Sequence, residues 1–265
     1  MYQTLHSIFA DKEGGVVFTC FGLWHLLYAV LAVAVMVTLL CCFAPKEQPV
    51  KDRLLNILVA VPFGLYMLDF FLMPFAYGEI DVDKLPFHAC TAMCVMCFAS
   101  RHDKHLGKYR LHFALLGLIA NLTYVVYPAG VMWYEIHPLS YRAVQTLLFH
   151  SAMVIYGVLA LLYDSERLQI KRCYRDVVIL GALTVWAMLG NALYSGAAGD
   201  YDRDFNWFFL KADPLDLFSE SIAPYIMPWL NIVIFFAAEA LIYLLLALLN
   251  KLRRPTAVEK AQMHK

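Results

Sequence analysis

Long apolar runs separated by short polar segments organise the chain. Seven runs approach the length of a membrane-spanning helix, and none alternates apolar and polar residues with a period of two. They cover residues 16–43, 54–75, 85–100, 111–127, 141–163, 177–195 and 225–249. Because a helix needs roughly 20 apolar residues to cross the hydrocarbon core, the pattern predicts an all-α polytopic membrane protein. We expect a single domain, residues 1–265, with seven transmembrane helices.

The composition agrees with a membrane protein and excludes several other classes. Of 265 residues, 62% are hydrophobic and 16% are charged, whereas a soluble domain averages about 45–50% apolar and about 25% charged residues. A disordered chain, a coiled coil and a nucleic-acid-binding protein are therefore excluded. The seven cysteines are an odd number and lie mostly inside apolar runs, which argues against a disulfide framework.

Basic residues predict the orientation of the chain in the membrane. The N-terminus and the second, fourth and sixth connections hold four Lys and Arg residues, whereas the other connections and the C-terminus hold sixteen. Basic residues near the ends of spans stay on the cytoplasmic side. The alternation therefore predicts that the N-terminus lies outside and the C-terminus lies inside.

Polar side chains concentrate in the half of the helices that this orientation turns outward. The set is His25, Asp69, His88, Cys90, Asn121, His150 and Asn191. The inner half is expected to be almost purely apolar, and only Glu239 lies deeper. Ionisable groups in hydrocarbon are costly unless they face a cavity or a partner, so one shared polar pocket that opens outward is the economical interpretation. The alternative is a set of separate hydrogen bonds between pairs of helices.

The fifth span carries a polar stripe that enters this predicted pocket. Arg142, Thr146 and His150 recur every four residues and share one face, and Gln145 lies beside them. Below His150 the same helix is apolar, so the stripe predicts how deep the pocket reaches.

The segment Leu85-Pro-Phe-His88-Ala-Cys90 begins the third span. Pro86 suits the first helical position, which would place His88 in the first turn and Cys90 just after it. A helix N-terminus favours the thiolate form that makes cysteine a nucleophile. Residues two apart on a helix diverge by about 200°, so a base for Cys90 would come from another helix, with His150 or His25 at the right depth.

The cysteines of this span have two other interpretations. Cysteine is a common small buried residue, and Cys94 and Cys97, on the same helix face, are expected to serve in packing. A shared metal ion is not predicted, because Cys90 and Cys97 would lie roughly 10 Å apart along a helix. We expect no metal and no cofactor.

The order of these segments resembles a known family. Phe21-Gly-Leu-Trp-His25, the Leu-Pro-x-His88-x-Cys90 segment and Gln145-x-x-x-x-His150 are similar to segments of the bacterial YwaF-like integral membrane proteins, whose eukaryotic relative is transmembrane protein 164. A late segment, Asn206-Trp-Phe-Phe-Leu followed by Pro214 and Pro228-Trp229, resembles their last connection. The resemblance covers most of the chain and implies a bacterial plasma membrane protein.

The resemblance also implies an activity, because the eukaryotic relative is understood as a phospholipid acyltransferase that uses a cysteine and a histidine. The matching positions are Cys90, as nucleophile, and His150, as base. A membrane lipid would be the substrate, and water as the acceptor would make the protein a lipid hydrolase. The residues expected to bind substrate or support catalysis are His25, Asp69, His88, Arg142, Gln145, Asn191 and Asn206.

The sequence is also compatible with a different class of function. Seven helices around an outward pocket also describe a small-molecule transporter or a ligand-binding, receptor-like protein without catalysis. The sequence shows no repeat and no pair of broken helices, which argues against transport. No nucleic acid is expected as a partner, and the sequence does not indicate protein partners.

Overall fold

The structure is a computed structural model of the 265-residue chain. The residues that it describes are 9, 15–77, 82–132, 136–164, 168–194, 206–211, 217–219 and 221–253. Within these residues the regular elements are all helical and no strand is present. The all-α prediction is confirmed.

Eight α-helices are found in the described part of the chain. They are α2 (Leu23–Phe43), α3 (Gln48–Tyr77), α4 (Ala89–His102), α5 (Arg110–Val126), α6 (Ala129–Met132), α7 (Tyr141–Tyr163), α8 (Tyr174–Tyr194) and α9 (Ala223–Arg253). The connections contain the 3-10 turns η1 (Val82–Lys84), η2 (Gly107–Tyr109), η4 (Ile170–Arg172) and η5 (Trp207–Phe209). Pro128 follows the end of α5, and Tyr127 before it is no longer helical, because a residue before proline avoids the helical conformation.

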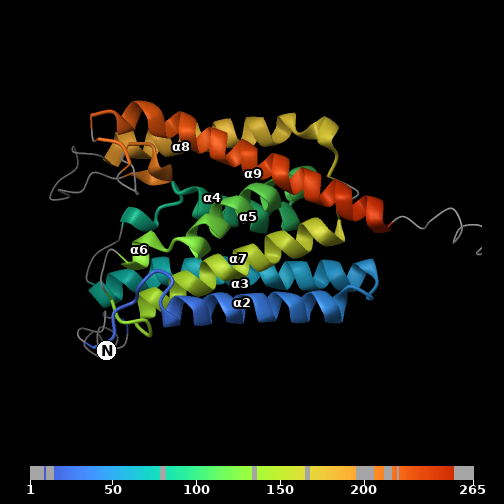
Figure 1. The fold of residues 1–265 in the computed structure, drawn as a ribbon, viewed down its shortest axis with the longest axis horizontal. Helices are drawn as coiled ribbons and strands as arrows, with labels where there is room; N and C mark the ends of the chain where they lie inside the picture. Colours follow the sequence, from blue (N-terminus) through green and yellow to red (C-terminus); the bar gives the residue numbers. More distant parts are fainter. Residues whose placement is uncertain are drawn as a thin grey trace, which may run out of the picture.

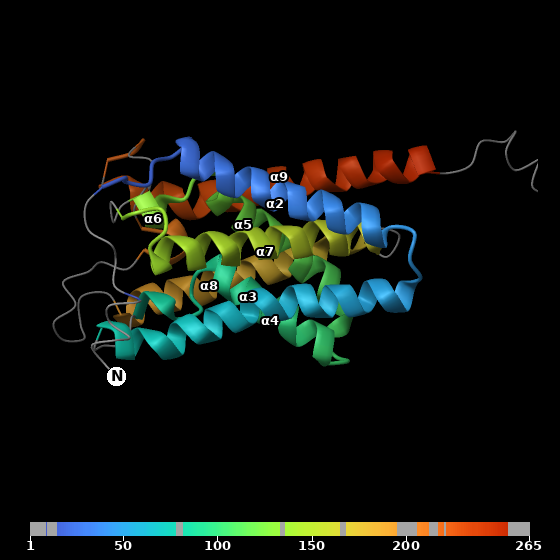
Figure 2. The ribbon, with the colours of Figure 1, turned by 90° about the horizontal axis from the view of Figure 1, so that it is seen from below.

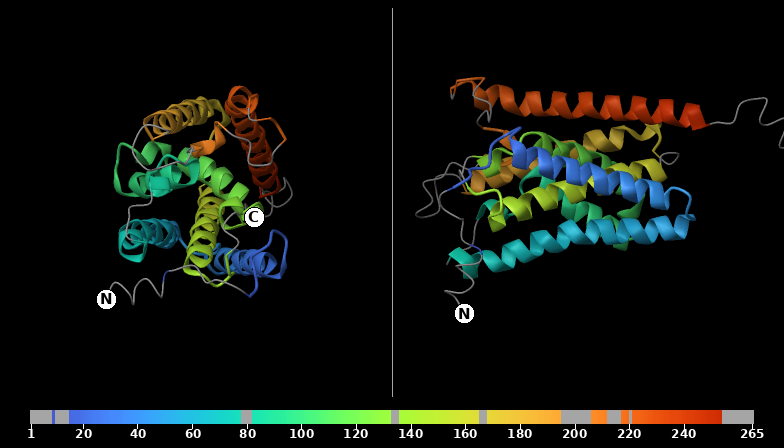
Figure 3. Two further views of the ribbon diagram at one scale, coloured as in Figure 1. Left: turned by 90° about the vertical axis from the view of Figure 1, so that its left-hand side faces the viewer. Right: turned by 60° about the horizontal axis from the view of Figure 1, so that its bottom comes forward.

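The long helices form one elongated bundle in which successive helices run in opposite directions (Figures 1 and 2). Seen along the bundle in Figure 3, α7 passes between neighbouring helices, whereas α2 and α9 lie at the periphery. More than half of the residues in the apolar windows of α5 and α7 are buried, and none in that of α2. Helices α5 and α7 therefore form the centre, and α2 presents apolar side chains on its surface.

The two ends of the bundle differ in composition and are named accordingly. The basic end, on the right in Figure 1, contains four parts of the chain. They are residues 44–47, residues 103–109, residues 164 and 168–173, and the end of α9. The η5 end, on the left, gathers residues 15–22, 82–88, 127–132, 136–140 and 206–211.

Within the described residues, six helices are long and apolar enough to cross a membrane. The six stretches are Leu23–Phe43, Gln48–Leu72, Gly107–Val126, Tyr141–Tyr163, Ile170–Tyr194 and Ala223–Leu252. They match six of the seven predicted spans, and the prediction of an integral membrane protein is confirmed. The remaining predicted span corresponds to α4, which has only 14 residues and is about 21 Å long at 1.5 Å per residue.

The start of α4 differs from the prediction. The helix begins at Ala89, and His88 is its N-cap residue with an extended backbone, so the placement of Pro86 at the first helical position is wrong. The Pro86 carbonyl instead accepts a hydrogen bond from Trp186 Nε1 at 2.8 Å, and the Phe87 amide donates to the Leu85 carbonyl at 2.7 Å. Contacts with another helix therefore hold this segment as a turn, and α4 begins later than proline alone indicates.

The first helix also begins later than predicted. Residues 16–19 are not helical, and the Phe18 amide donates to the Ile136 carbonyl at 3.0 Å. Gly22 is the N-cap residue of α2. A long-range backbone bond therefore holds apolar residues that could have extended the helix.

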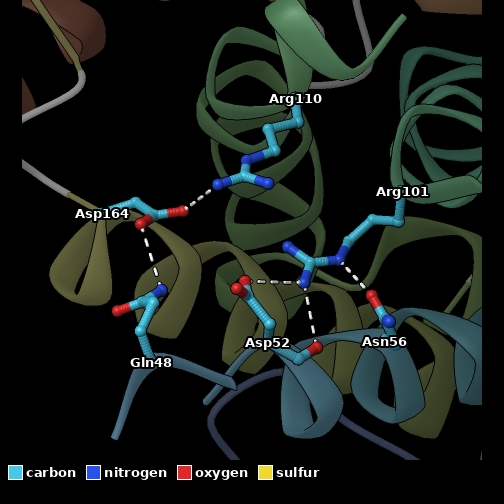
Figure 4. A network of polar contacts seen from close by, with 6 residues as sticks. All are labelled: Gln48, Asp52, Asn56, Arg101, Arg110 and Asp164. Carbon is cyan, nitrogen blue, oxygen red and sulfur yellow. Dashed lines mark hydrogen bonds and ion pairs between the residues drawn. The ribbon is translucent and has the colours of Figure 1, made fainter. Parts of the chain in front are cut away.

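A network of charged side chains ties four helices together at the basic end (Figure 4). Arg101, at the end of α4, donates to the Asp52 carbonyl at 2.9 Å, to Asp52 Oδ1 at 3.1 Å and to Asn56 on α3. Arg110, at the start of α5, forms an ion pair of 2.7 Å with Asp164 at the end of α7. Gln48 Nε2 donates to the other oxygen of Asp164 at 3.3 Å.

A second polar cluster lies toward the same end of the bundle and is centred on a fully buried carboxylate. His112 Nδ1 lies 2.7 Å from Asp176 Oδ1, and the Tyr243 hydroxyl donates to Asp176 Oδ2 at 2.8 Å. Asp176 is fully buried, and the three residues come from α5, α8 and α9. The prediction that this half is almost purely apolar is therefore wrong. The ends of the helices carry charged residues next to the connections, and these helix ends pack against one another.

Candidate functional site

Cys90 is the second residue of α4 and lies at the η5 end. The first intrahelical bond of α4 runs from the Ala92 amide to the His88 carbonyl at 2.9 Å, so the amides of the three preceding residues have no intrahelical acceptor. The backbone amides of Cys90 and Thr91 interact with the Cys90 sulfur. The thiol is half-buried and not part of a disulfide. These amides and the positive end of the helix dipole stabilise negative charge on the sulfur, whereas burial of the thiol opposes its ionisation.

Two contacts from α3 position the segment that leads into α4. Asp69, which is 2% exposed, forms an ion pair of 2.7 Å with Lys84 Nζ. One turn earlier, the Tyr66 hydroxyl donates to the Lys84 carbonyl at 2.8 Å. Asp69 therefore acts on the site by holding η1 and the start of α4.

Phe87, just before His88, is enclosed by aromatic rings. Its ring centroid lies 4.8 Å from that of Trp186, 4.9 Å from that of Trp207 and 5.9 Å from that of Tyr194. Gly190 on α8 permits this approach, since a Cβ at that position would lie 2.5 Å from the Phe87 ring. The backbone of the His-x-Cys segment is thereby fixed against α8.

His150 lies in the middle of the bundle with one ring nitrogen bound to a neighbouring helix. Its Nδ1 lies 2.8 Å from Asn121 Oδ1 on α5. The Asn121 amide nitrogen donates to the Gly117 carbonyl at 2.7 Å, which fixes the amide so that its oxygen faces the imidazole. Because an amide oxygen only accepts hydrogen bonds, Nδ1 carries the proton and Nε2 carries the lone pair. No hydrogen bond to Nε2 is found among the described residues.

Aromatic rings hold the plane of the His150 imidazole. The Tyr124 ring stacks on it with centroids 3.8 Å apart and planes 13° apart, and the Phe149 ring meets it edge-on at 4.9 Å. His88 and Lys84 lie within electrostatic range of His150, and Lys84 lies within the same range of Cys90. The His-x-Cys segment and His150 therefore share one region of the structure.

The η5 turn closes this region from the side of α8 and α9. Trp207 is fully buried, and its backbone is held by the side chain of Asn191 through bonds of 2.9 and 3.0 Å. Asn206 acts within the turn, where its Oδ1 accepts from the Lys211 amide at 2.8 Å. The predicted supporting residues Asn191 and Asn206 thus shape η5.

His25 differs from His150 in its hydrogen bonds. Its Nδ1 accepts from the Phe21 amide at 2.9 Å, and its Nε2 lies 2.8 Å from the Val125 carbonyl. Both ring nitrogens are therefore engaged by backbone groups, and His25 fastens the start of α2 to the end of α5.

The polar stripe of the fifth predicted span is present on α7. Gln145 is buried, and its Nε2 donates to the Leu65 carbonyl at 3.4 Å while its Oε1 accepts from Thr146 at 3.2 Å. Arg142 is half-buried on the same helix, two turns before His150. Gln145 therefore links α7 to α3 next to the site.

Several residues that shape the site were not predicted as site residues. Asn121, which positions His150, was recognised in the sequence only as one of several outer polar residues. Its depth, similar to that of His150, is the one signal that pairs the two. Lys84 lies in a connection, and Asn231, which donates to the Phe208 and Phe209 carbonyls of η5, lies in the apolar helix α9. The sequence gives no signal for either residue. No group of three or more His, Cys, Asp or Glu side chains within the described residues is arranged to hold a metal ion.

The fold and the site together define a polytopic helical membrane protein with a half-buried cysteine at a helix N-terminus and an asparagine-bound histidine in the same region. A model of the TMEM164 family matches residues 20–249, and the chain belongs to that family. No curated protein and no solved structure matches the chain.

Proposed function

We propose that the protein is a lipid acyltransferase in which Cys90 carries the acyl chain as a thioester and His150 acts as the base. The observation that carries the proposal is the fixed tautomer of His150, with Nδ1–H bound to Asn121 and Nε2 open. A cysteine, a histidine base and an asparagine that orients it form the same set of roles as in papain-like proteases. Membership of the TMEM164 family supports the proposal.

The first half-reaction transfers the acyl chain to the enzyme. His150 Nε2 takes the proton of the Cys90 thiol, and the thiolate attacks the carbonyl carbon of a lipid ester. The tetrahedral intermediate collapses with cleavage of the ester C–O bond. The released lysolipid oxygen takes the proton from His150, and Cys90 is left as a thioester.

The second half-reaction repeats these steps in reverse with a new acceptor. The hydroxyl of a second lysolipid gives its proton to His150 Nε2 and attacks the thioester carbonyl. The C–S bond breaks, and the Cys90 thiolate recovers the proton from His150. Water in place of the lysolipid makes the same chemistry a hydrolysis.

The negative oxygen formed in both halves requires hydrogen-bond donors. The backbone amides of Cys90 and Thr91, at the start of α4, lie next to the sulfur, and we propose that the ring of His88, the N-cap residue, supplies a further donor. A membrane lipid suits a site on an apolar helix bundle, because the acyl chain can stay in the hydrocarbon while the ester reaches Cys90. We place the protein in a bacterial plasma membrane by its resemblance to YwaF-like proteins.

Trapping of the acyl-enzyme tests the proposed function. Purified protein is incubated with a phospholipid that carries a labelled acyl chain, and the Cys90 peptide is analysed by mass spectrometry. We expect a hydroxylamine-sensitive adduct on Cys90 that is absent from Cys90→Ala. Cys94→Ala, one turn further along α4, is the matched control and is expected to retain the adduct. Uptake of solute by reconstituted vesicles without an adduct would contradict the proposal and favour transport.

The orientation with the N-terminus outside and the C-terminus inside is proposed from the same basic residues as in the sequence. Cys173 is exposed at the basic end and gives a direct test. A membrane-impermeant maleimide is expected to label Cys173 only after cells are permeabilised, with Cys173→Ser as the background control. Equal labelling of Cys173 in intact cells would reverse the orientation.

A further inference from the structure

The η5 turn is held by two asparagines from different helices. Asn191, on α8, binds both the amide and the carbonyl of Trp207, at 2.9 and 3.0 Å. Asn231, on α9, donates to the carbonyls of Phe208 and Phe209, each at 3.0 Å. The backbone of three consecutive residues is therefore clamped by two side chains.

The clamped backbone has an unfavourable conformation. Phe208 and Phe209 have φ of 59° and 50°, in the left-handed region that residues with a side chain rarely adopt. Such strain persists only where the surroundings impose it, and it concentrates at functional sites. The four hydrogen bonds from Asn191 and Asn231 supply that constraint here.

One backbone amide of the η5 turn forms a hydrogen bond with the His-x-Cys segment. The Phe208 amide donates to His88 Nδ1 at 3.5 Å, so Nδ1 carries the lone pair and the ring proton is on Nε2. The buried Trp207 packs against Phe87, which holds the same segment in place. The tautomer of His88 is therefore opposite to that of His150.

We propose that Asn191 and Asn231 are positioning residues, which clamp η5 so that His88 presents Nε2–H as a hydrogen-bond donor to the carbonyl oxygen of the substrate. This inference rests on the proposed function. The two imidazoles then have complementary roles: His150 accepts the thiol proton, and His88 donates to the oxyanion. Asn191 and Asn231 touch neither the substrate nor the reacting atoms, and they act through η5.

Single and double variants measure this coupling. His88→Ala is expected to lower kcat of acyl transfer by roughly 10²–10³-fold, as loss of one oxyanion donor does. Asn191→Ala and Asn231→Ala are each expected to lower kcat by roughly 10–100-fold with little change in KM, as when the outer partner of a functional imidazole is removed. In a His88→Ala background, Asn191→Ala is expected to have no further effect on kcat. Thr184→Ala, on α8 but bonded within its own helix, is the matched control.

A second measurement does not depend on activity. Nitrogen NMR of histidine-labelled protein is expected to show His88 as the Nε2–H tautomer in the wild type, and to show loss of that preference in Asn191→Ala. An Nδ1–H tautomer of wild-type His88, or equal effects of Asn191→Ala with and without His88, would overturn the inference. If no acyl-enzyme forms but His88 shows the expected tautomer, the proposed function is refuted and the clamp of η5 is retained.

Discussion

Replacement of His150 with alanine is expected to slow formation of the Cys90 thioester by roughly 10²–10⁴-fold, the usual contribution of a positioned general base. The structure gives the reason, because Nε2 of His150 is the ring nitrogen left open when Asn121 holds Nδ1. Single-turnover acylation by a labelled phospholipid, followed by mass spectrometry of the Cys90 peptide, measures the rate. His102→Ala, at the basic end of α4, is the matched histidine control and should acylate at the wild-type rate.

Asn121 gives a finer test of the same mechanism. Asn121→Ala removes the acceptor that keeps the proton on Nδ1, and the other tautomer has a protonated Nε2 that cannot accept the proton of the thiol. We expect slower acylation in Asn121→Ala, and a smaller loss in Asn121→Asp, which keeps an acceptor oxygen. Wild-type acylation in both His150→Ala and Asn121→Ala would remove His150 from the mechanism.

Replacement of Asp176 with alanine is expected to cause the largest loss of stability. Asp176 is fully buried and binds His112 and Tyr243 from two other helices. Its removal leaves the buried His112 ring without a partner, at a cost of about 1–3 kcal/mol, and also frees the half-buried Tyr243 hydroxyl. The midpoint of thermal unfolding in detergent measures the effect and is expected to fall clearly.

A buried acidic residue on α9 supplies the control for Asp176. Glu239 is 4% exposed, and its Oε1 has no hydrogen-bond partner among the described residues. Glu239→Gln is therefore expected not to lower the unfolding midpoint. A midpoint of Asp176→Ala equal to that of the wild type would show that the His112–Asp176–Tyr243 cluster contributes nothing to stability.

Most of the fold could be predicted from the sequence because hydrophobic length is a local property. Six predicted spans correspond to helices long enough to cross a membrane. The errors lie at helix starts, where Pro86 and Phe18 are held by contacts with residues 100 or more positions away along the chain. A local pattern carries no information about such partners.

The candidate site was also predictable in part, because some of its features are local in the sequence. Cys90 and His88 stand in a short, recognisable segment, and the depth of His150 follows from counting along its helix. The engagement of both nitrogens of His25 with backbone groups and the pairing of Asn121 with His150 depend on which helices are neighbours. Residue type and depth alone do not distinguish a structural imidazole from one with a free nitrogen.

The sequence by itself determined that this is an all-helical membrane protein with polar residues at defined depths, since transfer of apolar side chains from water to lipid depends on each segment alone. Only the tertiary structure decided which polar groups meet, because hydrogen bonds and ion pairs require atoms from separate helices to lie within about 3 Å of each other. It thereby buried Asp176 between His112 and Tyr243, in a half of the bundle that the sequence indicated to be almost purely apolar. It also gave His150 and His88 opposite tautomers through neighbours that no local pattern names.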